Sequence, residues 1–202
     1  VSGLAWAGVN DAPMINNPGA QTTNEDSTYS LNGRFTVTET APASNLLRAT
    51  VSIVTGGANL SLTNGIVTAP SIVVDGQIAD VNQFLNTLSI IPAANWNGAG
   101  SFRIRITSDR TNQTASNTVT IDVPLTVAAV NDAPVASGSA TLTAVDEDDA
   151  APAGAEVSGL FSASFSDSTD TVSGGSSANS MAGVAVVGYT VNAAQGQWQY
   201  YN

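Results

Sequence analysis

The pentapeptide Val-Asn-Asp-Ala-Pro occurs twice in this chain, at residues 9–13 and again at residues 130–134. Apolar residues alternate in a similar way before both copies, over residues 4–8 and residues 125–129. Self-similarity at a fixed period is typical of tandem units. Proline removes a backbone donor and holds the residue before it extended, so a strand must end at each copy. The repeated pentapeptide therefore predicts a junction between successive domains.

This period divides the chain into three parts. Residues 1–9 are predicted to form the last strand of a preceding repeat, and residues 10–130 to form one complete repeat. Residues 131–202 are predicted to be the first part of a second repeat. A chain of 202 residues is long enough for one complete β-domain core with part of another.

The charged residues restrict the partners of the chain. Sixteen residues are acidic and five are basic, and all five basic residues are arginines between positions 34 and 110. Residues 131–202 contain eight carboxylates and no basic residue. Binding to a nucleic-acid backbone needs clustered Lys or Arg, so we expect no nucleic-acid partner.

The chain contains neither cysteine nor histidine. Disulfides, thiolate metal sites and the commonest transition-metal ligand are therefore ruled out, which leaves oxygen ligands of the kind that suit Ca²⁺. No apolar run approaches the roughly 20 residues that span a bilayer, so we expect no membrane span in this sequence. No signal peptide opens the sequence, so secretion would depend on a signal outside it.

Several segments alternate apolar and polar residues with the period of two that half-buried strands show. In residues 102–106 the apolar side chains point one way and two arginines the other. The same alternation occurs at residues 35–38, 50–53, 60–62 and 119–123. Turn signals separate the segments, at Asn32-Gly33, Gly56-Gly57, Asn64-Gly65, Asp75-Gly76 and Asn97-Gly98. This spacing predicts an all-β fold, a β-sandwich.

One segment of the complete repeat, residues 78–88, has helical spacing instead. Its apolar residues are Ile78, Val81, Leu85 and Leu88. Asp80, with Gln83 three positions later, indicates a capping box. We therefore expect one short helix here and a structural role for Asp80.

The second repeat has weaker signals. We expect strands at residues 139–145, 157–161, 182–191 and 197–201, and a loop rich in Gly and Ser at residues 173–180. We expect the later strands of this repeat to be missing, and an unfinished sandwich leaves open edges that favour pairing with another chain. The leading strand, residues 1–9, is of the right kind to fill such a gap in a neighbouring molecule.

Four motifs together cover most of residues 10–134: Asn-Asp-Ala-Pro after a terminal strand, Asn24-Glu25-Asp26, Ile-Ala-Asp-Val-Asn at 78–82, and Pro-Ala-Ala-Asn-Trp-Asn-Gly at 92–98. They resemble the bacterial cadherin-like repeats of giant RTX-type adhesins. Residues 131–202 resemble a sister repeat type of the same proteins, through motifs that include Phe165-Ser166-Asp167 and Gly-Gln-Trp-Gln-Tyr at 196–200. The resemblance implies tandem Ig- or cadherin-like β-sandwich domains, with the short helix in the first complete repeat.

The resemblance also implies calcium at the junctions between repeats. The ligands would be the Glu of Asn-Glu-Asp, the Asn-Asp of the linker and aspartates at the top of the next domain. At the internal junction these residues are Glu25, Asn131, Asp132, Asp167 and Asp170. At the outer junction they are Asn10, Asp11 and Asp109, while Glu147 and Asp148 would serve a third junction.

The outer junction departs from the family pattern. Where such repeats carry Asp-x-Asp after the second strand, this chain has Thr38-Glu39-Thr40, and Arg110 beside Asp109 competes for charge. For all the acids named above, turn chemistry is the alternative, since Asp and Asn also bond their own backbone in turns. Asp146 and Asp149 could equally belong to a solvated acidic loop.

Aromatic residues raise the question of sugar binding, through Trp96, Trp198, Tyr200 and Tyr201. Aromatics at strand positions more often belong to the core, and we expect the Trp96 indole to be buried in the first sandwich. A glycosidase needs two carboxylates across a cleft, whereas the acids here cluster at junctions and turns. We therefore expect no enzymatic activity.

These observations favour a non-catalytic extender repeat of a large, secreted, calcium-dependent bacterial adhesin, with a role in cell adhesion and biofilms at the cell surface. Its partners would be the neighbouring repeats of the same chain. Two alternatives stay open. One is a subunit of an extracellular filament or surface layer that self-associates through residues 1–9 and the incomplete second repeat, and the other is a carbohydrate-binding module.

Overall fold

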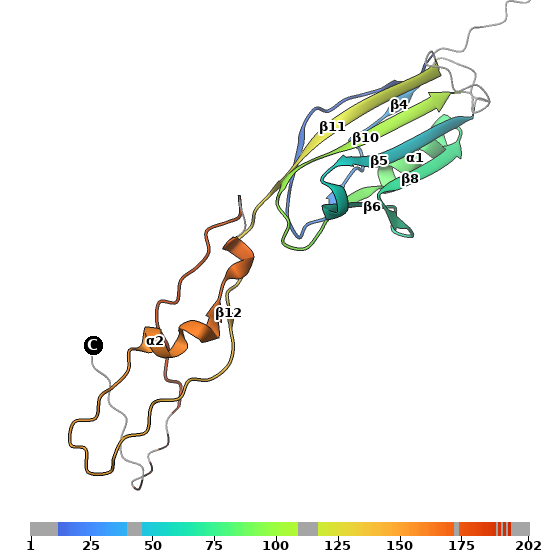
Figure 1. Ribbon diagram of the computed structural model, residues 1–202. Helices are drawn as coiled ribbons and strands as arrows, with labels where there is room; N and C mark the ends of the chain where they lie inside the picture. The colour runs from blue at the N-terminus through green and yellow to red at the C-terminus, as the bar shows by residue number, and fades with distance from the viewer. Residues whose placement is uncertain are drawn as a thin grey trace, which may run out of the picture. The chain divides into compact units, whose positions relative to one another are not determined.

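A computed structural model describes residues 12–39, 46–108, 117–171 and 174–188, together with residues 190, 192 and 194 (Figure 1). The chain divides into two compact units. The first unit comprises residues 1–131 with residues 172–176, and the second comprises residues 132–171 with residues 177–202. The strand expected at residues 1–9 lies outside the described residues.

The larger sheet of the first unit has five strands in the order β2-β11-β10-β5-β8 (Figure 1). Their bounds are Gln21–Asn24 for β2, Thr118–Ala128 for β11, Gly98–Ser108 for β10, Leu47–Thr55 for β5 and Ser71–Gly76 for β8. β2 and β11 pair in parallel, and every other neighbouring pair is antiparallel. The long strands β5, β10 and β11 contain three of the segments whose alternation predicts strands.

A second sheet of the first unit has four short antiparallel strands in the order β3-β9-β6-β7. Their bounds are Tyr29–Ser30 for β3, Ser89–Pro92 for β9, Leu60–Thr63 for β6 and Thr68–Ala69 for β7. β1 (Met14–Ile15) and β4 (Val37–Thr38) form a separate antiparallel pair, and the 3-10 helix η1 (Gly57–Asn59) connects β5 to β6. The described residues are thus mostly strand in several sheets, with two short helices in the whole described part, in agreement with the all-β prediction.

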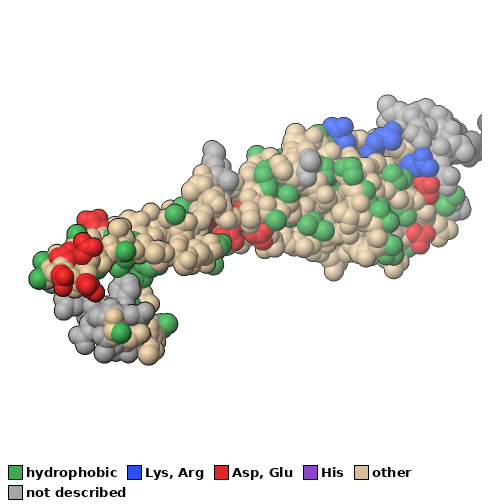
Figure 2. All heavy atoms as spheres, turned by 60° about the horizontal axis from the view of Figure 1, so that its bottom comes forward, with side chains coloured by type: hydrophobic (Ala, Val, Ile, Leu, Met, Phe, Trp, Pro, Cys, Tyr) green, Lys and Arg blue, Asp and Glu red, His purple; other side chains and the backbone are tan. Residues whose placement is uncertain are grey.

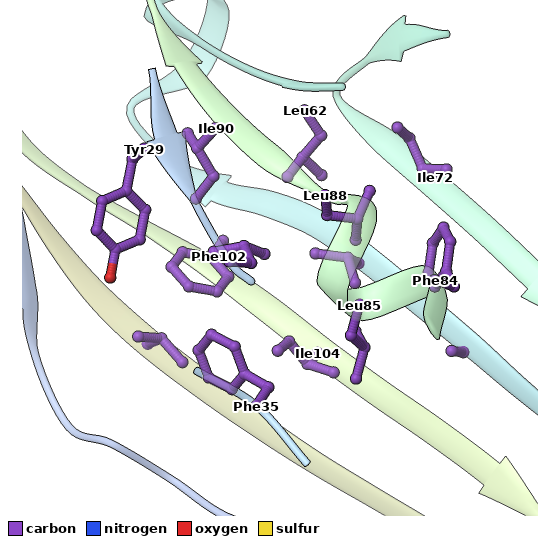
Figure 3. Packing of buried hydrophobic residues seen from close by; sticks show 14 of the residues in the cluster. Tyr29, Phe35, Leu62, Ile72, Phe84, Leu85, Leu88, Ile90, Phe102 and Ile104 are labelled. Carbon is purple, nitrogen blue, oxygen red and sulfur yellow. The ribbon is translucent and has the colours of Figure 1, made fainter. Parts of the chain in front are cut away.

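One hydrophobic core takes side chains from both sheets and from the helix between β8 and β9 (Figure 3). In β10 the side chains of Phe102 and Ile104 are fully buried, whereas Arg103 and Arg105 lie on the opposite face. The Phe102 ring meets the Phe35 ring edge-on, with centroids 5.8 Å apart and planes at 84°. Because successive side chains along a strand point to opposite faces, the apolar side chains of β10 fix which face of the sheet is buried.

The predicted helix is present as α1 (Ile78–Thr87), which buries Val81 and Leu85 against the core. The prediction of a capping box is right, but the partner predicted for Asp80 is wrong. The helix begins after Gln77, whose N–H donates to Asp80 Oδ2 (2.9 Å). Asp80 is structural, as expected, but it is the third residue of the helix and pairs with Gln77, not with Gln83.

The turn expected at Asp75-Gly76 is also wrong, because both residues belong to strand β8. Strand β8 runs almost directly into α1, which brings the strand end close to the first helical turn. A Cβ added to Gly76 would lie 2.6 Å from the Cβ of Asp80. Glycine is therefore required at position 76 because Asp80 of the helix comes close to it, and not because the chain turns there.

The second unit has less regular structure than the sequence predicts. Its described elements are the antiparallel pair β12 (Val135–Ala136) and β13 (Phe165–Ser166), the helix α2 (Val157–Phe161), and the 3-10 helices η3 (Ser162–Ser164) and η4 (Ser168–Thr171). The strands expected at residues 139–145 and 157–161 are wrong, since the first segment is irregular and the second is α2. Residues 182–188 contain no strand either, and residues 197–201 lie outside the described residues.

Two physical reasons account for these errors. A strand needs a partner for its backbone groups, and no described segment pairs with residues 139–145 or 182–188. In α2, the apolar residues Val157, Leu160 and Phe161 are three and four positions apart, a spacing that suits a helix. The Leu160 N–H accordingly donates to Glu156 O (3.0 Å).

Surface charge differs between the units, since every arginine lies at or before residue 110. In the face shown in Figure 2, basic side chains appear only on the first unit. None of the helices in the described part of the chain has the length and apolarity needed to span a bilayer.

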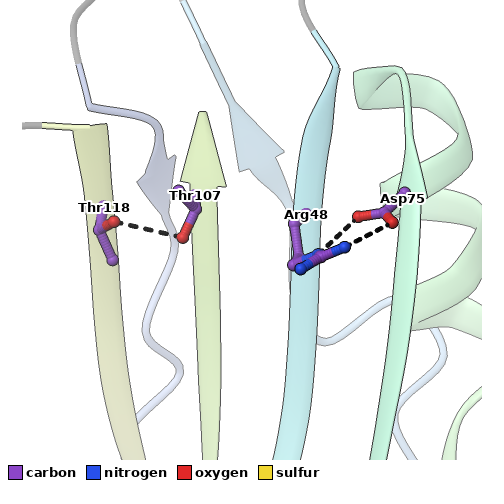
Figure 4. A network of polar contacts seen from close by, with 4 residues as sticks. All are labelled: Arg48, Asp75, Thr107 and Thr118. Atoms are coloured by element: carbon purple, nitrogen blue, oxygen red, sulfur yellow. Dashed lines mark hydrogen bonds and ion pairs between the residues drawn. The ribbon is translucent and has the colours of Figure 1, made fainter. Parts of the chain in front are cut away.

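Two Arg–Asp ion pairs link neighbouring strands on the face of the five-stranded sheet that points away from the core. Arg48 of β5 donates two hydrogen bonds to Asp75 of β8 (2.8 and 2.9 Å; Figure 4). Arg103 of β10 binds Asp122 of β11 in the same way (2.7 and 2.8 Å). Each pair joins residues directly opposite in register. Because all four side chains reach solvent, each pair contributes little to stability.

Replacing Arg103 by Ala should raise the pKa of Asp122. The hydrogen bond from the Arg103 guanidinium holds the pKa of Asp122 below its ordinary value. A depressed folded-state pKa stabilises the fold above the unfolded-state pKa, and this contribution is lost as the pH falls through the depressed value. In Arg103→Ala, NMR titration of the carboxyl group should show the Asp122 pKa returning upward.

Arg48→Ala is the matched control, because it breaks the other pair and should leave the Asp122 titration unchanged. An Asp122 pKa that is the same in the parent and in Arg103→Ala would show that the pair does not form in solution.

Candidate metal centre

Glu25 connects the end of strand β2 to the chain that leaves β11. The two strands run in parallel with Asn24 opposite Ala128, and the Glu25 N–H extends this pairing by donating to Ala128 O (2.9 Å). The Glu25 side chain then accepts the Val130 N–H at Oε1 (2.6 Å). Glu25 is only 5% exposed. Its carboxylate therefore binds the first residue of the second Val-Asn-Asp-Ala-Pro copy.

The neighbouring Asp26 has a different role. Its Oδ1 accepts the N–H of Asn95 (2.9 Å), in the turn before β10. Asp26 and Asn95 both have φ of 55°, a left-handed conformation that Asp and Asn tolerate better than most residues. The Asn-Glu-Asp motif and the Pro92–Gly98 segment, distant in sequence, are thus joined by a backbone-to-carboxylate bond. Apart from the presence of both motifs, nothing in the sequence predicts this contact.

Asp170 plays a part in the second unit that resembles that of Glu25 in the first. It lies in η4, is 4% exposed, and accepts the Asp132 N–H at Oδ2 (3.1 Å). The N–H groups on either side of Asn131, those of Val130 and Asp132, are therefore each bound by a buried carboxylate of their own unit. Hydrogen bonds to ionised acceptors are stronger than those between neutral groups.

Asp167 is a buried acid of the second unit. It is 8% exposed, and its Oδ2 accepts the N–H of Asn179. Its Oδ1 is fully buried and has no hydrogen-bond partner among the residues that the structure describes. A buried carboxylate oxygen without a donor costs free energy, and a donor, a water molecule or a cation beside it would lower that cost.

The donors fit calcium in kind, because they are carboxylate oxygens with no nitrogen or sulfur among them. The structure brings Asp132 and Asp170 together and places Asp167 just before η4. Glu25 and the exposed Asn131 belong to the first unit. In the described part of the chain, however, no group of three or more acidic side chains is already gathered as a metal site. A full calcium shell here would need backbone oxygens or water as well.

The structure adds none of the remaining candidate ligands to Asp132, Asp167 and Asp170. Asn10, Asp11 and Asp109 of the expected outer site lie outside the described residues. Glu147 and Asp148 are exposed at the tip of a turn closed by the Asp149 N–H, which donates to Asp146 O (3.2 Å).

Two side chains near the predicted sites have structural contacts instead. Asp149 Oδ1 accepts the Ala151 N–H (3.0 Å), a bond to a nearby backbone group of the kind that Asp makes in turns. Glu39 accepts a hydrogen bond from the buried hydroxyl of Ser108.

Trp96 is half-buried and packs against the core rather than within it. The other three aromatics of the suggested sugar platform, Trp198, Tyr200 and Tyr201, lie outside the described residues. Comparison with known proteins adds no assignment: no family model, curated protein or solved structure matches the chain.

Proposed function

We propose that this chain is a non-catalytic structural extender of a large, secreted, calcium-dependent bacterial adhesin, built from tandem Ig- or cadherin-like β-sandwich repeats. The observation that carries the proposal is the buried Asp167 Oδ1, which has no donor in the described part of the chain, in a unit that also buries Asp170. Residues 111–202 contain no arginine, lysine or histidine. A metal cation is then the natural partner for these carboxylates, since this part of the chain supplies no positive side chain.

The residues that would hold calcium are Asp132, Asp167 and Asp170 in the second unit, with Glu25 and Asn131 as the ligands predicted from the first. When bound, the ion would supply the positive counter-charge that no side chain of residues 111–202 provides for these carboxylates. That one ion takes ligands from both units stays a prediction of the sequence. The carboxylates of Glu25 and Asp170 already bind the N–H groups of Val130 and Asp132, each within its own unit.

The mechanical consequence follows from electrostatics. Without a cation, carboxylates near the linker repel one another, which favours a broad range of linker conformations. A bound divalent cation removes this repulsion and adds oxygen contacts, so it narrows the range. A segment that stiffens in this way would hold a distal binding domain away from the cell surface.

Calcium should raise the stability of the chain. Extracellular calcium modules have Kd values of about 10⁻⁴ to 10⁻³ M, so about 1 to 10 mM calcium should stabilise the folded state by roughly 1 to 3 kcal/mol. Chemical denaturation with and without calcium measures this difference, and EDTA should abolish it. Magnesium should give a smaller effect, because it demands a stricter octahedral geometry.

Asp167→Asn and Asp148→Asn form a matched pair for this experiment, because each removes one charge from the second unit. Asp167→Asn should lose most of the calcium effect, whereas Asp148→Asn, at an exposed turn, should keep it. Equal calcium effects in the two variants would exclude Asp167 as a ligand.

Small-angle scattering tests the mechanical part separately. The parent should sample a narrower range of shapes in calcium than in EDTA, and Asp132→Ala should remove the difference while both units stay folded. Superimposable profiles for the parent in calcium and in EDTA would reject the extender mechanism even if calcium binds.

A further inference from the structure

The β6–β7 hairpin ends in a turn that is held by one asparagine side chain. Asn64 Oδ1 accepts hydrogen bonds from the N–H groups of Ile66 (3.1 Å) and Val67 (2.9 Å). Gly65 is exposed, has φ of 84°, and donates its N–H to the Thr63 hydroxyl (3.0 Å). The Asn64 amide therefore lies over the backbone that follows it, and the Gly65 N–H is bonded to a side chain rather than to another strand.

The hydrogen bonds that Ile66 and Val67 donate to Asn64 Oδ1 favour a reaction between Asn64 and Gly65. The Gly65 nitrogen can attack the Asn64 side-chain carbon Cγ, which forms an N–Cγ bond and places negative charge on Oδ1. The Cγ–Nδ2 bond then breaks, and ammonia leaves with the proton that the Gly65 nitrogen gives up through solvent. Water opens the resulting five-membered imide at either carbonyl and yields aspartate or isoaspartate. Overall, one water is consumed and one ammonia is released.

The turn lowers the barrier to the first step. Two backbone N–H groups already point at Oδ1, where the negative charge develops, as donors do in an oxyanion hole. Gly65 carries no Cβ to hinder the approach of its nitrogen. No atom of the described residues lies within 4 Å of the position that a Cβ of Gly65 would occupy, so the turn also has room to rearrange.

The other two Asn-Gly steps lack this arrangement. Within the described residues, no donor reaches the side-chain oxygen of Asn32. Gly98, which follows Asn97, is the first residue of β10 and pairs with Val127 of β11. The backbone nitrogen at that step is therefore fixed in the sheet.

We propose that Asn64 is a site of spontaneous deamidation, promoted by the folded hairpin. Either product adds one negative charge to the hairpin tip. Isoaspartate also inserts a methylene into the main chain, which breaks the geometry that binds the N–H groups of Ile66 and Val67. Conversion at Asn64 should therefore loosen the turn that presents Ile66, whose side chain is 91% exposed.

Peptide mapping by mass spectrometry, with enzymatic methyl labelling of isoaspartate, tests this proposal on the full chain after incubation at mildly alkaline pH. Asn64 should lose its amide about tenfold faster than Asn32 or Asn97, a smaller factor than one oxyanion-hole donor gives in enzymes because no base is positioned here. Asn32 and Asn97 serve as internal references in the same digest. Equal or faster conversion at either reference would overturn the proposal.

Incubation in concentrated urea separates the fold from the local sequence. Without the turn, the three Asn-Gly steps should convert at similar rates. If Asn64 leads by the same margin in urea, the hairpin plays no part and the proposal fails. Asn64→Gln is the assignment control, because its longer side chain would have to close a less favourable ring, and it should remove the Asn64 signal without changing the other two.

Discussion

Phe102→Ala should lower the free energy of unfolding of the first unit by about 3 to 5 kcal/mol. Phe102 is fully buried at the centre of β10, so its truncation leaves a cavity. The strands paired on both sides of β10 limit how far the structure can collapse into that cavity. The loss includes the edge-on contact with Phe35, a type of aromatic pair that adds about 0.5 to 1.5 kcal/mol beyond burial. Urea denaturation followed by circular dichroism measures the change.

Val73→Ala provides the comparison, because Val73 is in the same sheet but is 52% exposed on the edge strand β8. Its truncation should change the stability by less than about 0.5 kcal/mol. Phe102→Leu should cost less than Phe102→Ala, since it leaves a smaller cavity. If Phe102→Ala and Val73→Ala unfold at the same urea concentration, the core described around β10 is wrong.

The fold of the first unit was largely predictable from its alternation. In residues 102–106 the apolar and charged residues alternate without exception, and every apolar residue of this run is buried. The helix at α1 was predictable for the same reason, because its apolar spacing differs clearly from that of a strand. Its N-cap was not, because Gln77 precedes the apolar pattern and gives no apolar signal.

The second unit shows where this reasoning fails. The segment of residues 157–161 has apolar residues that suit a strand end or a helical turn, and a segment of five residues is too short for the pattern to decide. Residues 139–145 have a strand-like composition, but composition does not reveal whether a partner strand is within reach.

The candidate site was predictable in residue type but not in contacts. The resemblance to cadherin-like repeats predicts Glu25, Asp167 and Asp170 as ligands, and the structure shows all three to be buried. The sequence could not show that Glu25 binds the Val130 N–H or that Asp170 binds the Asp132 N–H, since these bonds join segments far apart in the chain. Both carboxylates thus have a hydrogen-bonding role of their own, whatever part they play in metal binding.

Glu25→Ala tests that structural role, and it should lower the free energy of unfolding by about 1.5 to 3 kcal/mol in EDTA. The variant leaves the part-buried Val130 N–H without its charged acceptor, and the Val130 amide should lose protection in hydrogen exchange. Glu25→Gln keeps a carbonyl oxygen at the same reach, so it should retain most of the protection and lose only the contribution of the charge. Measuring both variants again in calcium separates metal binding from hydrogen bonding, because only a ligand role adds a further loss there. If Glu25→Ala has the same free energy of unfolding as the parent in EDTA and the Val130 amide stays protected, the Glu25–Val130 hydrogen bond contributes nothing to the fold. A loss of stability seen only in calcium would then assign Glu25 a role as a metal ligand.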